Sequence, residues 1–173
     1  MAMTRRRLLA TSTAVMGATA MGLMGFFGRN SQTAAGTAFE VVRSDGEWRS
    51  LLTPEQFRVL RGHGTERAGS SPLDREKRAG TFHCAGCDLP LFASSTKFDS
   101  GTGWPSFWAP LENAVGTSED YALFVKRIEV HCRRCGGHLG HVFDDGPKPT
   151  GLRYCMNGVA LKFVPAAASG QAS

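Results

Sequence analysis

The sequence has little charge, and almost no excess of either sign outside its first 38 residues. Charged residues make up 20% of the 173 residues and hydrophobic residues 42%, which excludes the low hydrophobicity and high charge of a disordered chain. Internal repeats and coiled-coil heptads are also missing. The length provides material for one packed domain of ordinary size and excludes two large domains.

The formal net charge of +5 comes from the N-terminus. Arg5, Arg6, Arg7 and Arg29 are the only charged residues before Phe39. Of the 20 basic residues, 16 remain when these four are set aside, against 15 acidic residues, so the rest of the chain carries a net charge of +1. Binding to a polyanion needs a clustered excess of Lys and Arg. We therefore expect no nucleic acid among the partners of this protein.

The first 38 residues are predicted to be an export signal. A basic segment is followed by the uncharged, mostly apolar stretch Leu8–Gly28, as in the n-region and h-region of a signal peptide. The pair Arg5-Arg6, with Thr4 before it and leucines two and three residues after it, resembles the twin-arginine export motif. Small residues then offer a cleavage site after Ala35 or, preferably, after Ala38.

The alternative for this segment is a retained membrane anchor. Its 21 uncharged residues, each rising 1.5 Å, would just cross a hydrocarbon core of about 30 Å. A cysteine does not directly follow the apolar stretch, which argues against a lipoprotein. In either case we expect a bacterial protein that the twin-arginine translocation machinery exports to the periplasm, membrane-anchored if uncleaved. Residues 39–173 are then the functional domain.

One helix and several strands are expected in this domain. Thr53 is placed as an N-cap, Pro54 as the first helical residue and Gln56 as its capping-box partner, so a helix should run toward Leu60 and stop near Gly62. The segment from 65 to 78 is expected to be irregular. Strands are predicted at Thr81–Cys84, Tyr121–Val130, Leu139–Phe143 and Val159–Val164, and in the last of them Val159, Leu161 and Phe163 alternate onto one face.

Four of the five cysteines form two C-x-x-C pairs that are 44 residues apart: Cys84 with Cys87, and Cys132 with Cys135. Two such pairs supply four thiolates for one tetrahedral Zn²⁺. The alternative in an exported protein is one or two disulfides, but two pairs of the same form favour zinc. Four cysteine ligands leave no open position, so the predicted zinc is structural. Twin-arginine transport moves folded protein, which would let zinc bind reduced thiols before export.

The fifth cysteine, Cys155, has no partner in this pattern. An unpaired cysteine is by default a small buried hydrophobe. Arg153, two residues earlier, can lie on the same side of a strand and favour the reactive thiolate, and Asn157 lies two residues further along that side. Spacing alone leaves both interpretations of Cys155 open.

Two histidines and a tryptophan lie in segments that suit thiol chemistry. His138 and His141 follow the second cysteine pair closely and could act as proton donors, whereas a single histidine would more often be structural. Trp104 lies between a glycine and a proline in an irregular segment. It is either a core residue or the wall of an apolar pocket for a small group such as a methyl.

Together these motifs resemble the B-type methionine sulfoxide reductases, which reduce the R epimer of methionine sulfoxide. The resemblance runs from about Trp48 to Pro165 and rests on both cysteine pairs and on the segments Lys97–Phe107, His138–Phe143 and Arg153–Asn157. It implies a peptide-methionine (R)-S-oxide reductase that acts on oxidised methionine residues in proteins. It also implies a mainly β fold, with two packed antiparallel sheets, a structural zinc site of four cysteines at one end and a few short helices.

The same resemblance implies roles for the matching residues. Cys155 would be the nucleophile that becomes a sulfenic acid. His138, His141 and Asn157 would orient the substrate and protonate its oxygen. Trp104 would receive the methyl group of the substrate, and Asp145 would support the site together with Arg153.

One departure from the family pattern concerns the recycling of Cys155. Many relatives carry a resolving cysteine where this chain has Thr102, and the other four cysteines are assigned to zinc. We therefore expect an external reductant, either a thioredoxin-like protein or a small thiol. Two other classes remain open at this point: a zinc-ribbon interaction module, which could lose Cys155 without consequence, and a thiol peroxidase, which would turn over peroxide at least as fast as sulfoxide.

Overall fold

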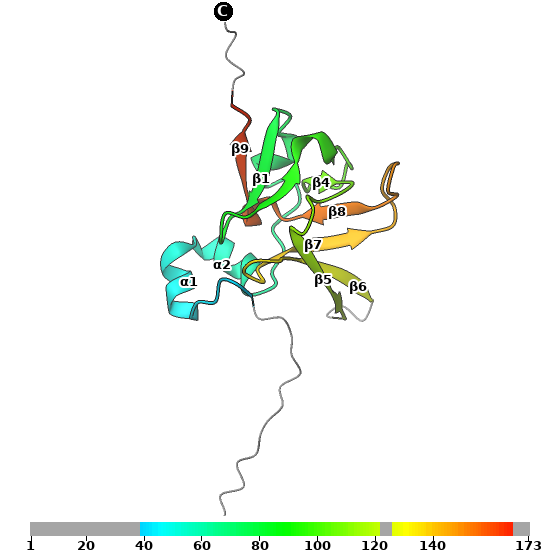
Figure 1. The fold of residues 1–173 in the computed structure, drawn as a ribbon. Helices are drawn as coiled ribbons and strands as arrows, with labels where there is room; N and C mark the ends of the chain where they lie inside the picture. The colour runs from blue at the N-terminus through cyan, green and yellow to red at the C-terminus, as the bar shows by residue number, and fades with distance from the viewer. Residues whose placement is uncertain (1–38, 122–125, 168–173) are drawn as a thin grey trace, which may run out of the picture. The chain divides into compact units, whose positions relative to one another are not determined.

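The computed structural model describes residues 39–121 and 126–167 (Figure 1). The predicted export signal lies outside these residues. The described elements are α1 (Asp45–Leu51), α2 (Pro54–Leu60), β1 (Gly80–Cys84), β2 (Pro90–Ala93), β3 (Lys97–Phe98), β4 (Ser106–Phe107), β5 (Val115–Asp120), β6 (Arg127–Cys132), β7 (His138–Phe143), β8 (Arg153–Met156) and β9 (Leu161–Pro165), with 3-10 turns at Pro72–Arg75, Ser94–Thr96 and Gly158–Ala160. Among the described residues, every helix is too short or too polar to cross a membrane.

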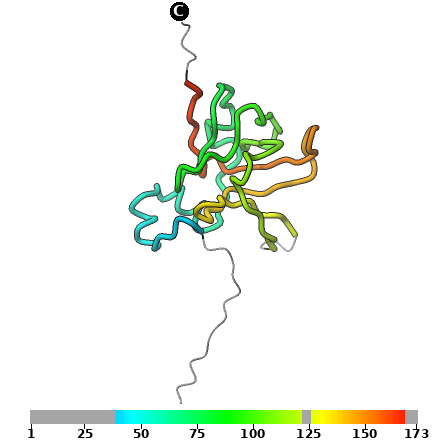
Figure 2. Tube along the Cα trace, in the orientation of Figure 1, coloured from blue at the N-terminus to red at the C-terminus, as the bar shows by residue number. Residues whose placement is uncertain are grey.

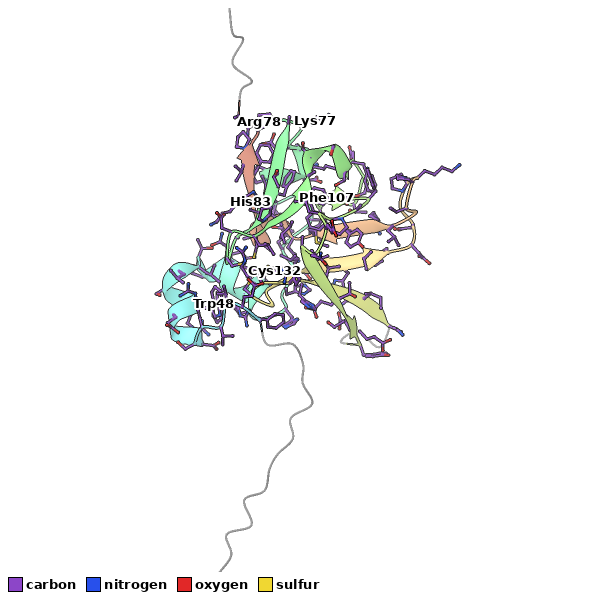
Figure 3. The ribbon with its side chains drawn as sticks, in the orientation of Figure 1. Trp48, Lys77, Arg78, His83, Phe107 and Cys132 are labelled. Atoms are coloured by element: carbon purple, nitrogen blue, oxygen red, sulfur yellow. The ribbon has the colours of Figure 1, made fainter. Side chains whose placement is uncertain are left out.

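The strands form two antiparallel sheets. One contains β2, β1 and β9 in that order, and the other contains β3, β4, β8, β7, β6 and β5. Aromatic side chains pack the two sheets together: the ring centroids of Phe82 and Phe92, from β1 and β2, lie 5.0 and 4.4 Å from that of Phe107 in β4. Phe107 lies in the middle of the strands in Figure 3. The expected mainly β fold of two packed antiparallel sheets is confirmed.

The two short helices begin at capping boxes, which satisfy backbone N–H groups that a helix leaves unpaired. At α2 the hydroxyl of Thr53 accepts the N–H of Gln56 at 3.2 Å, and the side chain of Gln56 accepts the N–H of Thr53 at 3.0 Å, as predicted. Helix α1 was not predicted, although Ser44 and Glu47 form the same kind of box. Its Trp48 is buried in the same core as Cys132, and Figure 3 shows it at the two helices.

Two sequence-based boundaries differ from the structure. The strand expected at Tyr121–Val130 is confirmed only from Arg127, where β6 begins, and β6 pairs with β5, a separate strand that precedes it and was not expected. The strand expected from Val159 starts only at Leu161, since Gly158–Ala160 forms a 3-10 turn. The segment from 65 to 78 is irregular as expected apart from one 3-10 turn, and Thr65 and Glu66 at its start contact the functional site.

Candidate active site and metal centre

The four paired cysteines form one cluster. Their Sγ atoms all lie within 4.8 Å of one another, with Cys84 to Cys135 at 3.7 Å and Cys87 to Cys132 at 3.5 Å. Thiolates bound at about 2.3 Å to a tetrahedral Zn²⁺ lie about 3.8 Å apart, so these separations fit such an ion. All of these cysteines are free thiols rather than disulfides. The cluster is therefore arranged to hold a metal ion.

Each cysteine pair is held by the same backbone turn. The amide of Asp88 donates to the carbonyl of Cys84 at 2.9 Å, and the amide of Gly136 donates to the carbonyl of Cys132 at 2.8 Å. Both donor residues have a left-handed backbone conformation, with φ of 62° at Asp88 and 66° at Gly136. Glycine and aspartate tolerate this conformation better than most residues, which explains why one of them follows the second cysteine of each pair.

The cluster connects the two sheets. Cys84 is the last residue of β1 in the three-stranded sheet, and Cys132 is the last residue of β6 in the six-stranded sheet. The start of the described chain lies beside the second pair, where the amide of Val41 donates to the carbonyl of Arg134 at 3.0 Å (Figure 2). A metal bound here would therefore cross-link elements that are far apart in the sequence.

A cavity of about 140 Å³ lies over the six-stranded sheet. Strand pairing builds it, because Cys155 of β8 lies opposite His141 of β7 on one side and opposite Ser106 of β4 on the other. Gly140 permits the close approach of β7 and β8, since a side chain there would collide with the carbonyl of Cys155. The cavity is lined by Thr65, Trp104, Arg127, Gly140, His141, Phe143, Cys155 and Asn157.

Four of the predicted site residues meet in this cavity: Trp104, His141, Cys155 and Asn157. The other three predicted site residues do not line it. His138 is buried and does not line the cavity, but its ring centroid lies 5.4 Å from that of His141. The predicted pair of Arg153 and Asp145 forms a two-pronged ion pair, with both N–O distances at 2.8 Å.

A β-bulge brings His138 and His141 together, although two residues that are three apart lie on opposite faces of a regular strand. Val130 pairs with Gly140 and His131 pairs with His138, so β7 contains one extra residue relative to β6. Because successive side chains of a strand alternate between faces, an insertion of this kind re-aims the residues that follow it. The structure thereby places His138 and His141 in ring contact.

Each histidine is held by a carboxylate. Nδ1 of His138 lies 2.7 Å from Oε1 of Glu129, while its Nε2 has no hydrogen-bond partner among the described residues. Nε2 of His141 lies 2.7 Å from Oδ2 of Asp120, which also accepts from Arg127 at 2.6 Å. The hydrogen bond from His138 lowers the pKa of Glu129 to about 2 despite its burial. Burial lowers the pKa of His141 below its usual range, and Asp120 opposes that effect.

The electrostatics of Cys155 have opposing contributions. Burial raises the pKa of its thiol, and this effect outweighs the hydroxyl of Thr102, whose Oγ1 lies 3.9 Å from Sγ, and the charge of Arg153. The spacing of Arg153 and Cys155 predicts only the contribution that favours the thiolate, whereas burial acts in the opposite direction. Burial of Cys155 therefore favours the protonated thiol over the thiolate in the free protein.

Glu66, which sequence reasoning missed, does not line the cavity but positions two residues that do. Glu66 is 5% exposed, and its carboxylate accepts the backbone amides of Gly158 and Val159 at 2.5 and 3.0 Å. Its own amide donates to the side-chain oxygen of Asn157 at 2.9 Å, and its carbonyl accepts the indole N–H of Trp104 at 3.3 Å. Glu66 thus fixes the orientation of two cavity residues.

Comparison with known proteins agrees with this geometry. The SelR domain matches residues 52–165. The chain belongs to the SelR family. It is 58% identical over 120 residues to peptide methionine sulfoxide reductase MsrB of Pseudomonas putida, covering 69% of this chain and 90% of the relative. The corresponding protein of Agrobacterium fabrum is 52% identical over 130 residues, covering 75% and 96%.

A relative from Methanosarcina mazei with the same name is 54% identical over 125 residues, covering 72% of this chain and 89% of the relative. The SelR family member described here is accordingly an enzyme, a peptide methionine sulfoxide reductase. Its cysteine cluster and its cavity both lie within the matched region.

Proposed function

We propose that this reductase acts on methionine-R-sulfoxide in proteins through thiol chemistry at Cys155. The observation that carries the proposal is that the Cys155 thiol shares one small cavity with Trp104, His141 and Asn157. A nucleophile, an aromatic wall and proton-donating groups within one site match the needs of sulfoxide reduction.

The cavity suits a methyl sulfoxide with a defined handedness. The rings of Trp104 and Phe143, which both line the cavity, provide apolar surface for the methyl group, while His141 and Asn157 provide polar contacts for the oxygen. The amide of Asn157 already donates to the carbonyl of Leu139 at 3.0 Å, and its Nδ2 has a second hydrogen for the substrate. When the sulfoxide sulfur faces Cys155, the other epimer would place its oxygen against the apolar rings and its methyl group against the polar side chains. The cavity therefore selects one epimer.

The chemical step conserves atoms and electrons. Sγ of Cys155 attacks the sulfoxide sulfur while the sulfoxide oxygen takes up a proton, and the oxygen is then transferred as hydroxyl to Sγ as methionine leaves. Methionine sulfur gains two electrons and Sγ loses two, so Cys155 becomes a sulfenic acid. The thiol gives up one proton and the oxygen gains one, with His141 and His138 as the groups that carry it.

The sulfenic acid is reduced from outside the chain. Thr102 stands where many relatives carry a resolving cysteine, and its Oγ1 lies 3.9 Å from Sγ of Cys155. The remaining four thiols form the metal cluster. Two external thiols therefore return Cys155 to its reduced form and give one disulfide and one water. A thioredoxin-like protein or a small thiol would supply them.

We further propose that the metal is a structural Zn²⁺ and that the substrates are exported proteins. The cluster of Cys84, Cys87, Cys132 and Cys135 has the donor set of closed zinc sites, which stabilise folds and leave no position for substrate. Export rests on the twin-arginine motif at Arg5-Arg6 and on the apolar stretch that follows it. An enzyme delivered to the periplasm would repair methionine residues oxidised there.

The test is a single turnover without reductant. The unaltered protein should form one methionine from methionine-R-sulfoxide and one Cys155 sulfenic acid, which a dimedone-type probe traps. Cys155→Ser should abolish reduction and keep its zinc, because a hydroxyl is a far weaker nucleophile and the four ligands are untouched. Trp104→Ala should lower kcat/KM for the R epimer. Equal turnover of both epimers, or an active Cys155→Ser variant, would refute the proposal.

A further inference from the structure

A second cluster of metal-ligating side chains lies outside the cavity. It contains His63 from the turn after α2, Glu129 from β6 and His138 from the start of β7, and one ligand atom of each lies within 4.8 Å of the others. Nδ1 of His63 and Nδ1 of His138 lie 3.0 and 2.7 Å from the same carboxylate oxygen, Oε1 of Glu129. The two imidazole rings face one another at a centroid distance of 5.2 Å.

This donor set is one that divalent transition metals use. Two imidazole nitrogens and one carboxylate oxygen bind Zn²⁺ at about 2.0–2.2 Å and leave further positions for water. Ligand atoms around a tetrahedral ion of this size lie about 3.3 Å apart. The observed separations of 2.7 and 3.0 Å need to open only by a few tenths of an ångström.

The cluster can open and can be reached from solvent. The side chain of His63 is 64% exposed, so it can move outward and admit an ion, whereas Glu129 and His138 are buried and form a fixed base. The pKa of Glu129 is lowered to about 2, mainly by the hydrogen bond from His138, so the carboxylate is ionised at neutral pH. The other oxygen of Glu129 accepts the hydroxyl of Ser118 at 2.6 Å, which holds the carboxylate in place.

We propose that His63, Glu129 and His138 form a second metal site that binds Zn²⁺ or a similar divalent transition-metal ion. The ion takes the place of the hydrogen that each Nδ1 now shares with Glu129. The ring hydrogen of His138 then resides on Nε2, and the metal-bound ring no longer takes up a second proton. Binding of the ion therefore occupies the nitrogen through which His138 now bonds to Glu129, so His138 no longer relays a proton between Glu129 and the cavity.

The functional consequence is reversible inhibition. This part rests on the proposed function, in which His138 and His141 carry a proton to the sulfoxide oxygen. The metal-binding part does not rest on it, because none of the three ligands lines the cavity. The two parts can therefore fail separately.

The binding test starts from protein that already holds one zinc at the cysteine cluster, without thiols in the buffer because they chelate zinc. Equilibrium dialysis against Zn²⁺ should show a second equivalent. His63→Asn should bind it at least ten-fold more weakly, since the amide oxygen of asparagine is a much weaker ligand for Zn²⁺ than an imidazole nitrogen. Asparagine tolerates the left-handed backbone of His63, whose φ is 52°, so this variant keeps the turn. Cys155→Ser is the matched control and should bind zinc as the unaltered protein does.

The activity test uses single turnovers of the same preparations. Without added metal, His63→Asn should form methionine at the rate of the unaltered protein. The second equivalent of Zn²⁺ should slow the unaltered protein at least ten-fold, and His63→Asn should need at least ten-fold more zinc for the same effect.

Three outcomes overturn the metal site: saturation at one zinc, unchanged affinity in His63→Asn, or loss of the second zinc in Cys155→Ser, which would place that ion at the thiol. A second zinc that depends on His63 and leaves the rate unchanged supports the site. That result would instead remove His138 from the proposed proton path.

Discussion

Substitution of Glu66 tests whether a residue outside the cavity determines its shape. Glu66→Ala removes the acceptor of two buried backbone amides, at Gly158 and Val159. A buried donor left without a partner costs about 1–3 kcal/mol, so the two would cost about 2–6 kcal/mol. Burial raises the pKa of Glu66, although the hydrogen bonds from both amides lower it. The cost of removing the carboxylate from water therefore offsets part of the stabilisation that these hydrogen bonds give. We therefore expect a loss of about 2–4 kcal/mol for Glu66→Ala.

Glu66→Gln separates the hydrogen bonds from the packing of the side chain. The amide oxygen can accept one backbone N–H, but the amide nitrogen then faces the other donor. The expected loss in unfolding free energy is about 1–2 kcal/mol, a noticeable share of a typical 5–15 kcal/mol. The backbone of Glu66 also holds Asn157 and Trp104, so a shift of this loop should lower kcat/KM at least ten-fold.

The assay combines urea unfolding of zinc-loaded protein with kcat/KM for methionine-R-sulfoxide. Glu55→Gln is the matched control, because Glu55 is an exposed carboxylate that pairs with Arg58 on the surface of α2. It should change neither the unfolding midpoint nor the rate. The reasoning is refuted if Glu66→Ala loses less than about 0.5 kcal/mol and keeps its kcat/KM.

Further predictions concern the metal cluster, the thiol and its neighbours. Cys132→Ser removes one ligand and should lower both zinc content and unfolding free energy, the latter by several kcal/mol, as measured by metal analysis and urea unfolding; folded, active protein without zinc would contradict it. The chemical step needs one proton in total on Cys155, whose pKa is raised, and His141, whose pKa is lowered. A plot of kcat/KM against pH should therefore be flat between these two pKa values and fall on either side. Arg153→Met removes the charge that lowers the pKa of Cys155, so the alkaline limb should move to higher pH and the plateau should fall; an unmoved limb would exclude this influence. Thr102→Cys places a thiol where a hydroxyl now lies 3.9 Å from Sγ, so two thiols instead of one should be lost per methionine, as thiol titration would show.

Sequence reasoning worked where a feature depends on residues close together in the chain. The metal cluster follows from two C-x-x-C pairs, since each pair is a local turn that presents two thiols in one direction. Helix α2 follows from Thr53 and Gln56, whose mutual hydrogen bonds need only three residues of spacing. Strands β1 and β7 were expected within one residue of their observed starts.

The features that were missed depend on contacts between distant segments. Strands β3 and β4 have two residues each and exist only because β8 and its neighbours pair with them, so no periodicity could reveal them. Glu129 reaches His138 across a bulge whose position is set by strand register. Glu66 lies 91 residues from Asn157 in the sequence, and nothing in its surroundings distinguishes it from a surface carboxylate. Supporting residues of the site were therefore invisible without the fold.

The metal cluster and the cavity are connected by very short segments of chain. Cys84 ends β1 and Cys132 ends β6, so an ion held by both joins the two sheets. Cys135 precedes His138 by three residues, and β7 begins at His138 and carries His141 into the cavity. Without metal, the start of β7 would lose this anchor, whereas the backbone pairing of β7 with β6 and β8 does not itself involve the ion. The proposed zinc thus acts on the chemistry by fixing where the histidines lie, which is why its removal should reduce activity before it melts the six-stranded sheet.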